Sequence, residues 1–361
     1  MTEDASRSNF LKRLGFGGLA LGGISVAGLK DPVTHDANRI AALEKRVVFL
    51  ESRDHVHTAS PTPTATPTVA PTPTATPTPV PTTFSWGMFD PPYPVDYSGQ
   101  AALATSLGRS PAVLHWFNAW TPWGSFAGWP NRDGIVDAHS RGKIPLITWE
   151  AWSGSGGRDG GNPFPLWQIA QGTFDAYIDS WANGIKALNS PIPVYLRPLH
   201  EMNISYEPGG YPWSVYKDGN PFGNTPAQYV AAWRHIVSRF RLVNANVKWV
   251  FNPTGDLTWN PVIPGVYPGD AYVDFVGFDA YEGPAAGSVA IDVGIVEAMS
   301  ARPLILSEVG GRANWITNEL GPALRRPRTA GAVWFNESVG VGVSLTDPTN
   351  VTALKTLLAS L

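Results

Sequence analysis

Short apolar or β-branched runs alternate with amphipathic stretches over residues 84–361. The apolar runs occupy residues 84–89, 112–118, 144–150, 193–201, 247–252, 273–281, 303–308 and 331–336. Between them, apolar side chains recur at helical spacing most clearly in Phe174–Leu188, Ala227–Leu242, Val289–Ser300 and Val351–Leu361. Eight strands alternating with helices predict an α/β fold of the (β/α)8 type, a TIM barrel.

A doubly wound open sheet is the competing fold, because it shows the same alternation of strands and helices. Such a sheet has a glycine-rich turn directly after its first strand. No turn of that kind follows the first apolar run, 84–89. The barrel is therefore the preferred prediction, with residues 84–361 as one catalytic domain.

Residues 1–30 carry Arg7, Lys12 and Arg13, followed by the apolar and glycine-rich run Leu14–Leu29. The run is short for spanning a bilayer, and basic residues before such a run are typical of export signals. The segment resembles a twin-arginine signal, with Ser8 in place of the second arginine. We expect an export signal or an uncleaved membrane anchor, with a buried helix as the alternative.

Two further segments separate this signal from the predicted barrel. In residues 31–59, apolar residues from Ile40 to Leu50 are spaced by 3, 4 and 3 positions, which places them on one helical stripe. This predicts a short amphipathic helix, either a spacer or, through 36–51, a weakly self-associating one. Residues 60–83 repeat Pro-Thr-Pro-Thr-Ala-Thr, a composition typical of a disordered, extended linker. We expect a secreted or cell-surface attached, extracytoplasmic protein that the anchor would tether to a membrane or cell surface.

The amino-acid composition limits the kinds of ligand that the protein is expected to bind. The net charge is −3 and charged residues make up 15% of the chain, so the composition gives no sign of a basic surface that would bind nucleic acid. Cysteine is absent, and the close pair His55 and His57 precedes the barrel, so no metal site and no cofactor are predicted. The chain has 15 Trp, 11 Tyr and 15 Phe, and such rings suit either a core or the apolar faces of sugars.

Two glutamates close apolar runs of the predicted barrel. Glu201 ends the fourth run and Glu308 the seventh, and catalytic residues of these barrels lie at the carboxyl ends of the strands. Retaining hydrolysis of a glycosidic bond needs two carboxyl groups about 5–5.5 Å apart, one to give a proton and one to attack. The residues predict the pair without assigning the two roles, since those depend on pKa values set by the surroundings.

The segment Arg197-Pro198-Leu199-His200-Glu201-Met202-Asn203 resembles the acid/base signature of glycoside hydrolase family 26, known chiefly for β-mannanases with some lichenases. Three more segments resemble the family in order, and aromatic residues follow the signature. These matches are Thr148-Trp149-Glu150, Gly277-Phe278-Asp279-Ala280-Tyr281 and Leu306-Ser307-Glu308, with Tyr206, Tyr211 and Trp213 after the signature. The resemblance spans 84–361 in essence.

The resemblance implies that Glu201 is the general acid/base and Glu308 the nucleophile. It also implies that Tyr281 hydrogen-bonds the nucleophile and that Trp334 forms a platform under the sugar. The residues expected to bind substrate or support the pair are His200, Arg197, Asn203, Tyr206, Trp149, Glu150, Asp279, Tyr281 and Trp334.

Several of these residues also have structural interpretations. His200 would hydrogen-bond the sugar, hold the acid in place, or sit satisfied in the barrel wall. Arg197 would lower the pKa of a nearby carboxylate or form a structural ion pair. Trp149 and Glu150 are expected as a pocket wall and an acceptor for a sugar hydroxyl, and Glu150 is the third carboxylate that competes for a catalytic role. Tyr281 has a core tyrosine as its alternative.

The predicted function is that of a retaining endo-β-glycosidase that hydrolyses a β-linked polysaccharide by double displacement, with β-1,4-mannan as the first expected substrate. The same chemistry on mixed-linkage β-glucan or xylan is the alternative. A non-catalytic surface glycan-binding protein and a metal-dependent barrel hydrolase are alternatives of other classes. Residues 204–210 depart from the usual pattern of the family after Asn203, so the reaction is better determined than the sugar.

Overall fold

The computed structural model describes residues 84–361 apart from 92, 122–125, 128–130, 154–160, 205–209, 216–221, 256, 258–262, 284–287 and 338–343. The predictions for 1–30, 31–59 and 60–83, and the prediction for Tyr206, lie outside the described residues. Within the described part of the chain, no helix has the length and apolarity needed to cross a membrane.

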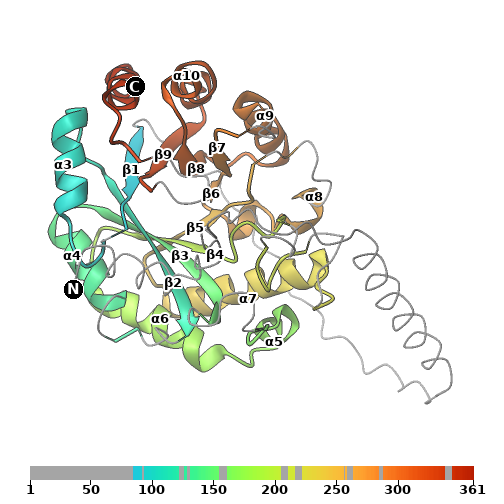
Figure 1. Cartoon of the computed structure of the whole chain (residues 1–361). Coiled ribbons are helices and arrows are strands. Elements are labelled where there is room, and N and C mark those ends of the chain that lie inside the picture. The colour runs from blue at the N-terminus through green and yellow to red at the C-terminus, as the bar shows by residue number, and fades with distance from the viewer. Residues whose placement is uncertain are drawn as a thin grey trace, which may run out of the picture. The chain divides into compact units, whose positions relative to one another are not determined.

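Parallel strands form a closed ring at the centre of the described region (Figure 1). The strands are β1 (Ser85–Phe89), β2 (Val113–Thr121), β3 (Ile144–Ser153), β4 (Val194–Pro198), β5 (Val247–Phe251), β6 (Phe275–Val276), β7 (Asp279–Tyr281), β8 (Leu304–Gly310) and β9 (Thr329–Phe335). β6 and β7 are two pieces of the sixth barrel strand, because both pair with β8. The pairing of β6 with β8 closes the ring, which confirms the predicted (β/α)8 barrel.

Helices surround this ring (Figure 1). They are α3 (Ser98–Leu107), α4 (Asn131–Ser140), α5 (Leu166–Ala170), α6 (Asp175–Leu188), α7 (Pro226–Val243), α8 (Ile263–Val266), α9 (Val289–Met299), α10 (Ala313–Trp315), α11 (Gly321–Leu324) and α12 (Pro348–Ala359), with the single turns η3 (Asp270–Tyr272) and η4 (Ile316–Leu320). The four helices predicted from periodicity correspond to α6, α7, α9 and α12 and are confirmed.

Local sequence explains why α7 begins and ends where it does. Thr225 caps its first turn by accepting a hydrogen bond from the Gln228 backbone, and the Gln228 side chain returns one to the Thr225 N–H, which is a capping box. Asn244 ends the helix in the left-handed conformation. The buried face of α7 includes Tyr229 and Trp233. This helix therefore fixes the outer side of the barrel next to β4.

The barrel interior changes from apolar to polar along the strands. One cluster of apolar residues fills its amino-terminal part, namely Val113, Leu146, Tyr195, Val250, Phe275, Ile305, Ala330 and Val333. Side chains two positions apart on a strand face the same side. His115, Thr148 and Arg197 each follow a member of this cluster by two positions and are fully buried. A polar layer therefore lies on the apolar one, towards the carboxyl ends of the strands.

The two strand ends next to the glutamates differ from the prediction. β4 ends at Pro198 rather than at Glu201, because Leu199 and Glu201 adopt positive φ angles of 50° and 48° that a strand cannot contain. β8 continues two residues past Glu308 to Gly310. Both glutamates still lie at or beyond the carboxyl end of the barrel, where the site was expected.

Candidate active site

Glu201 lies in a turn whose backbone is strained. A positive φ is rare for residues other than glycine and costs on the order of 1 kcal/mol or more, and this turn contains two such residues, Leu199 and Glu201. The Glu201 N–H donates to the Asn252 carbonyl at 2.8 Å. The Tyr229 hydroxyl of α7 donates to the Leu199 carbonyl at 2.9 Å. The turn is thus held from β5 and from α7, and it presents the Glu201 side chain at the barrel mouth.

Asn203 holds the same turn from the other side. Its amide nitrogen donates to the Thr254 carbonyl at 3.0 Å, and its amide oxygen accepts from the Thr254 N–H at 2.9 Å. Asn203 is almost fully buried. Both ends of its side-chain amide therefore bind the loop after β5, which makes Asn203 a support for Glu201.

Glu308 on β8 accepts hydrogen bonds on both carboxylate oxygens. The Tyr281 hydroxyl donates to Oε2 at 2.5 Å, which is the contact expected for Tyr281. The Nη2 atom of Arg197 donates to Oε1. The Nη1 atom of Arg197 donates to both oxygens of Asp279, at 2.9 and 3.1 Å. One buried guanidinium therefore binds two carboxylates, and the orientation of Glu308 is fixed from β4 and β7.

The surroundings of Glu201 favour its protonated form. Burial, followed by the negative charge of Glu308, raises the pKa of Glu201 to about 7, although Arg197 and hydrogen bonds to Asp279 and Thr254 oppose the shift. A hydrogen bond between two carboxyl groups requires a proton on one of them. Burial and the charge of Glu308 also raise the pKa of Asp279, so Glu201 and Asp279 share this proton as a pair. Glu201 is thus a proton donor near neutral pH, beside an acceptor carboxylate at Glu308.

Glu150 is a third inward-facing carboxyl group, on β3. The Trp152 indole N–H donates to its Oε2 at 3.3 Å, and Oε1 is buried with no hydrogen-bond partner among the described residues. Burial raises the pKa of Glu150 to about 8, with Glu308 and Glu201 adding to the shift and the Trp152 hydrogen bond and Arg197 opposing it. Glu150 therefore carries a proton at neutral pH, and one of its oxygens is left for a further hydrogen bond.

His200 and two aromatic residues form a wall next to Glu201. The His200 Nε2 atom lies 3.2 Å from the Tyr211 hydroxyl and 4.0 Å from Glu201 Oε2. Burial, and then the charge of Arg197, lower the pKa of His200 well below 6.5, so the ring is neutral. Tyr211 stacks on Trp213 with ring centroids 4.7 Å apart. Trp213 in turn donates its N–H to the His200 carbonyl at 2.7 Å.

The prediction that Trp149 forms a pocket wall is wrong. Its ring stacks on Tyr177 with centroids 5.6 Å apart and donates to the Tyr177 hydroxyl at 3.1 Å. It also contacts Trp181 of α6 and Phe240 of α7. Neighbouring residues of a strand face opposite sides, so Glu150 points into the barrel and Trp149 into the helix layer.

The prediction that Trp334 is a platform under the sugar is also wrong. Trp334 is fully buried, in register with Met88, and belongs with it to the main hydrophobic core cluster. The next residue of β9, Phe335, takes the inward position. It stacks on Phe89 at 4.5 Å and meets Tyr281 edge-on at 5.9 Å. Phe335 is therefore the aromatic ring that β9 contributes beside Tyr281 and Glu308.

Two polar residues of the site, His115 and Thr148, were given no role from the sequence. His115 Nε2 lies 2.7 Å from the Thr148 hydroxyl, which also contacts Arg197. Each is a buried polar residue two positions beyond a member of the apolar layer, Val113 or Leu146. Strand alternation alone could have placed both inside the barrel.

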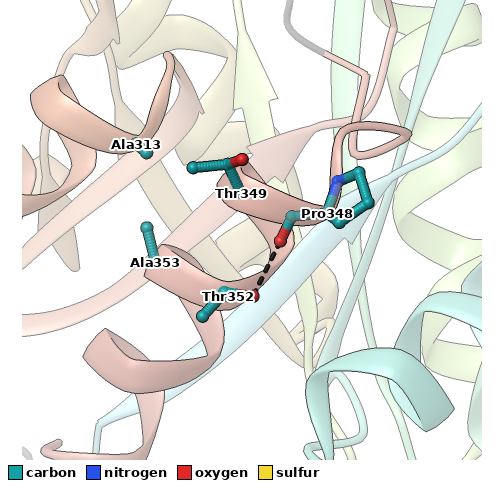
Figure 2. A pocket seen from close by; sticks show the side chains of 5 residues that line it. All are labelled: Ala313, Pro348, Thr349, Thr352 and Ala353. Atoms are coloured by element: carbon teal, nitrogen blue, oxygen red, sulfur yellow. Dashed lines mark hydrogen bonds between the residues drawn. The ribbon is translucent and has the colours of Figure 1, made fainter.

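Two other features of the described residues lie outside this cluster. No cluster of three or more His, Cys, Asp or Glu side chains there has an arrangement that could hold a metal ion. A surface hollow is lined by Ala313 of α10 and by Pro348, Thr349, Thr352 and Ala353 of α12 (Figure 2). It shares no residue with the carboxylate cluster described above.

A closed (β/α)8 barrel with a proton donor and an oriented carboxylate at its carboxyl end is the arrangement that barrel glycoside hydrolases use. Residues 168–319 match the family model described as Glycosyl hydrolase family 26. This segment of the chain is similar to that family. The match contains Glu201, Asp279, Tyr281 and Glu308.

Sequence relatives extend the similarity over more of the barrel. The chain is 34% identical over 251 residues to Endoglucanase H of Acetivibrio thermocellus, which covers 64% of this chain and 25% of that protein. It is 33% identical over 138 residues to the "Mannan endo-1,4-beta-mannosidase A and B" protein of Caldalkalibacillus mannanilyticus, covering 37% of this chain and 25% of that protein. The chain thus matches about a quarter of the length of each of these relatives.

Solved structures share the fold. A double mutant of the Cellulomonas fimi endo-β-1,4-mannanase superposes with a TM-score of 0.56 at 20% identity, covering 77% of this chain and 70% of that one. A β-mannanase of glycoside hydrolase family 26 from Bacteroides ovatus superposes with a TM-score of 0.54 at 18% identity, covering 77% of this chain and 89% of that one. At these identities the similarity supports the barrel fold alone.

Proposed function

We propose that this protein is a retaining endo-β-glycosidase that hydrolyses a β-linked polysaccharide, with β-1,4-mannan as the first substrate. The observation that carries the proposal is the difference between two neighbouring carboxyl groups. Burial and Glu308 raise the pKa of Glu201 to about 7, which suits a general acid. Glu308 accepts from Tyr281 and Arg197, which suits an oriented nucleophile.

The reaction takes two steps. In the first, a Glu308 oxygen bonds to the anomeric carbon, the bond from that carbon to the leaving oxygen breaks, and Glu201 gives that oxygen its proton. In the second, Glu201 takes a proton from water, the water oxygen bonds to the anomeric carbon, and the bond to Glu308 breaks. Both carboxyl groups return to their starting states, and the product keeps the β configuration.

The surrounding residues have separate parts in these steps. Tyr281 and Arg197 each hold one oxygen of Glu308, which restricts its rotation and aims it at the substrate. The neutral His200 lies 4.0 Å from Glu201 and adds no positive charge that would favour loss of the acid's proton. The buried Oε1 of Glu150 has no hydrogen-bond partner among the described residues, and we assign it as the group that meets a hydroxyl of the sugar.

A β-glucan is the second candidate substrate, because Endoglucanase H is the relative that matches the larger share of this chain. Three mannan endo-1,4-β-mannosidases among the relatives favour mannan. Product analysis on mannan, mixed-linkage β-glucan and xylan would decide between them. Hydrolysis of mixed-linkage glucan without hydrolysis of mannan would reject the first choice of substrate and keep the reaction class.

Variants of the two glutamates test the mechanism. Glu201→Ala and Glu308→Ala should each lower kcat by several orders of magnitude on natural substrate. Azide should rescue Glu308→Ala with inversion to an α-glycosyl azide, and Glu201→Ala with retention to a β-glycosyl azide, provided that the leaving group is activated. Unchanged turnover in either variant would reject the mechanism, and glycan binding without turnover in wild type would favour a non-catalytic binding protein.

We also propose an extracytoplasmic location, either secreted or attached to the cell surface. The basic and apolar pattern of 1–30 and the Pro/Thr repeat of 60–83 support it. Retention of the signal would tether the chain to a membrane, and residues 36–51 would allow weak self-association. Cell fractionation with amino-terminal sequencing tests location and cleavage, and sedimentation of chains with and without 31–59 tests association.

A further inference from the structure

Behind the nucleophile, β2, β3 and β4 contribute one buried chain of hydrogen bonds. His115 Nε2 lies 2.7 Å from the Thr148 hydroxyl oxygen. The same oxygen lies 2.8 Å from Nε and 2.5 Å from Nη2 of Arg197. All three side chains are completely buried. The chain therefore leads from His115 to the guanidinium that binds Glu308 and Asp279.

Counting protons fixes the direction of every bond in this chain. Arg197 has only donors, so the Thr148 oxygen accepts from it twice. The hydroxyl proton of Thr148 is then left for His115 Nε2, which must accept. The Nη2 atom of Arg197 also lies 3.4 Å from the same Nε2, but its two protons are directed at Thr148 and Glu308, so the single lone pair of Nε2 accepts from Thr148. His115 can accept there only as a neutral ring with its proton on Nδ1.

The surroundings of His115 agree with a neutral ring. Its ring packs against Phe89 and Phe117, with centroids 5.4 and 4.8 Å away. The titratable groups coupled to it are Arg197 and His200, and neither supplies a negative charge. Burial, and then the charge of Arg197, lower the pKa of His115 well below 6.5. A protonated ring would turn an N–H towards both Thr148 and the guanidinium and break the chain.

We propose that His115 and Thr148 are positioning residues for the nucleophile, acting through Arg197. By accepting from Nε and Nη2, the Thr148 oxygen fixes the plane of the guanidinium. Nη1 is then directed at Asp279 and Nη2 at Glu308. His115 orients the Thr148 hydroxyl so that its lone pairs face Arg197. The inference rests on the proposed glycosidase function, because it gives the pair a role in the attack of Glu308.

Thr148→Val tests this chain with little change of shape, because valine keeps the branched side chain and loses the hydroxyl. We expect kcat to fall about ten- to a hundredfold, the range for loss of a hydrogen bond to a charged group, with KM changed less than threefold. Thr148→Ser restores the hydroxyl and should recover most of the loss. Covalent labelling of Glu308 by a 2-deoxy-2-fluoro glycosyl fluoride should slow in parallel.

Histidine variants provide the matched comparison. His115→Phe keeps a ring in the contact with Phe89 and Phe117 and removes the acceptor, so it should slow labelling as Thr148→Val does. His139→Gln changes a half-buried histidine in the last turn of α4 and should leave kcat unchanged. A Thr148→Val enzyme with wild-type kcat and labelling rate would overturn the inference, as would failure of Thr148→Ser to recover activity.

Nitrogen-15 NMR of histidine-labelled wild-type protein tests the proton assignment without any turnover. We expect His115 to remain neutral, with Nε2 unprotonated and Nδ1 protonated, from pH 5 to 8. A cationic ring or a proton on Nε2 in that range would overturn the inference. Failure of wild-type protein to hydrolyse any glycan would instead reject the proposed function. The NMR experiment would still test the protonation state of His115, because it does not depend on turnover.

Discussion

The hydrogen bond from Tyr281 to Glu308 offers a single-atom test of how the nucleophile is held. Tyr281→Phe removes only the hydroxyl that lies 2.5 Å from Glu308 Oε2 and keeps the edge-on ring contact with Phe335. A hydrogen bond to a charged group contributes about 1.5–3 kcal/mol, and about 1.4 kcal/mol corresponds to a tenfold change in rate. We therefore expect kcat for glycosyl-enzyme formation to fall about 10- to 150-fold.

The assay is pre-steady-state hydrolysis of an aryl β-glycoside, which separates formation of the glycosyl-enzyme from its breakdown. Tyr195→Phe is the matched control, because it removes a phenol hydroxyl from β4 in the apolar layer, where the ring contacts Phe275. The control should stay within twofold of wild type. A Tyr281→Phe rate within twofold of wild type would refute the reasoning, and so would an equal loss in both variants.

Three further outcomes follow from the structure. Burial and Glu308 raise the pKa of Glu201 to about 7, and an acid must be protonated, so kcat/KM should fall as pH rises through about 7; a profile that stays flat well above that pH would contradict the role. Burial raises the pKa of Glu150 from 4.5 to about 8, so between these pH values only the native state keeps the proton. The free energy of unfolding of wild type, relative to that of Glu150→Gln, should therefore decline as pH rises through this range. A pH-independent difference in urea unfolding would contradict this. Gly277→Ala would place a Cβ 1.7 Å from the Ile305 carbonyl oxygen and should lower the melting temperature severely. Gly294→Ala, with open space around it in α9, should instead stabilise the protein by about 0.5–1 kcal/mol. Similar melting curves for the two variants would contradict the close approach at Gly277.

The strands were predictable because parallel strands buried on both faces are continuous apolar runs. Helices with a clear apolar stripe, such as α7, were predictable for the same kind of reason. α4 was missed because its buried residues include Asn131 and Gly134, which give no stripe. α3 was missed because its buried face includes Gln100. In these helices, packing buries polar or small residues that a hydrophobic pattern would place at the surface.

The positions of the carboxylates in the site were predictable from the sequence, and those of the aromatic residues were less so. Trp149 and Glu150 are neighbours on one strand, so they cannot both face the barrel interior. Which face of β9 carries Trp334 depends on a shift in register between β8 and β9. Nothing in the sequence indicates that shift. The positive φ angles of Leu199 and Glu201 are likewise invisible, because residues of these types rarely adopt them.

The acid and the nucleophile differ because four buried carboxyl groups share one cation. Glu150, Glu201, Asp279 and Glu308 surround Arg197, and full ionisation would leave a large uncompensated charge in a medium of low dielectric constant. Arg197 makes its direct contacts with Asp279 and Glu308, and burial raises the pKa values of Glu201, Glu150 and Asp279, so these groups do not all ionise together near neutral pH. In the proposed mechanism, the contact of Arg197 with Glu308 favours Glu308 as the attacking carboxylate and leaves Glu201 as the acid, so the residues that position this guanidinium would also set the two roles.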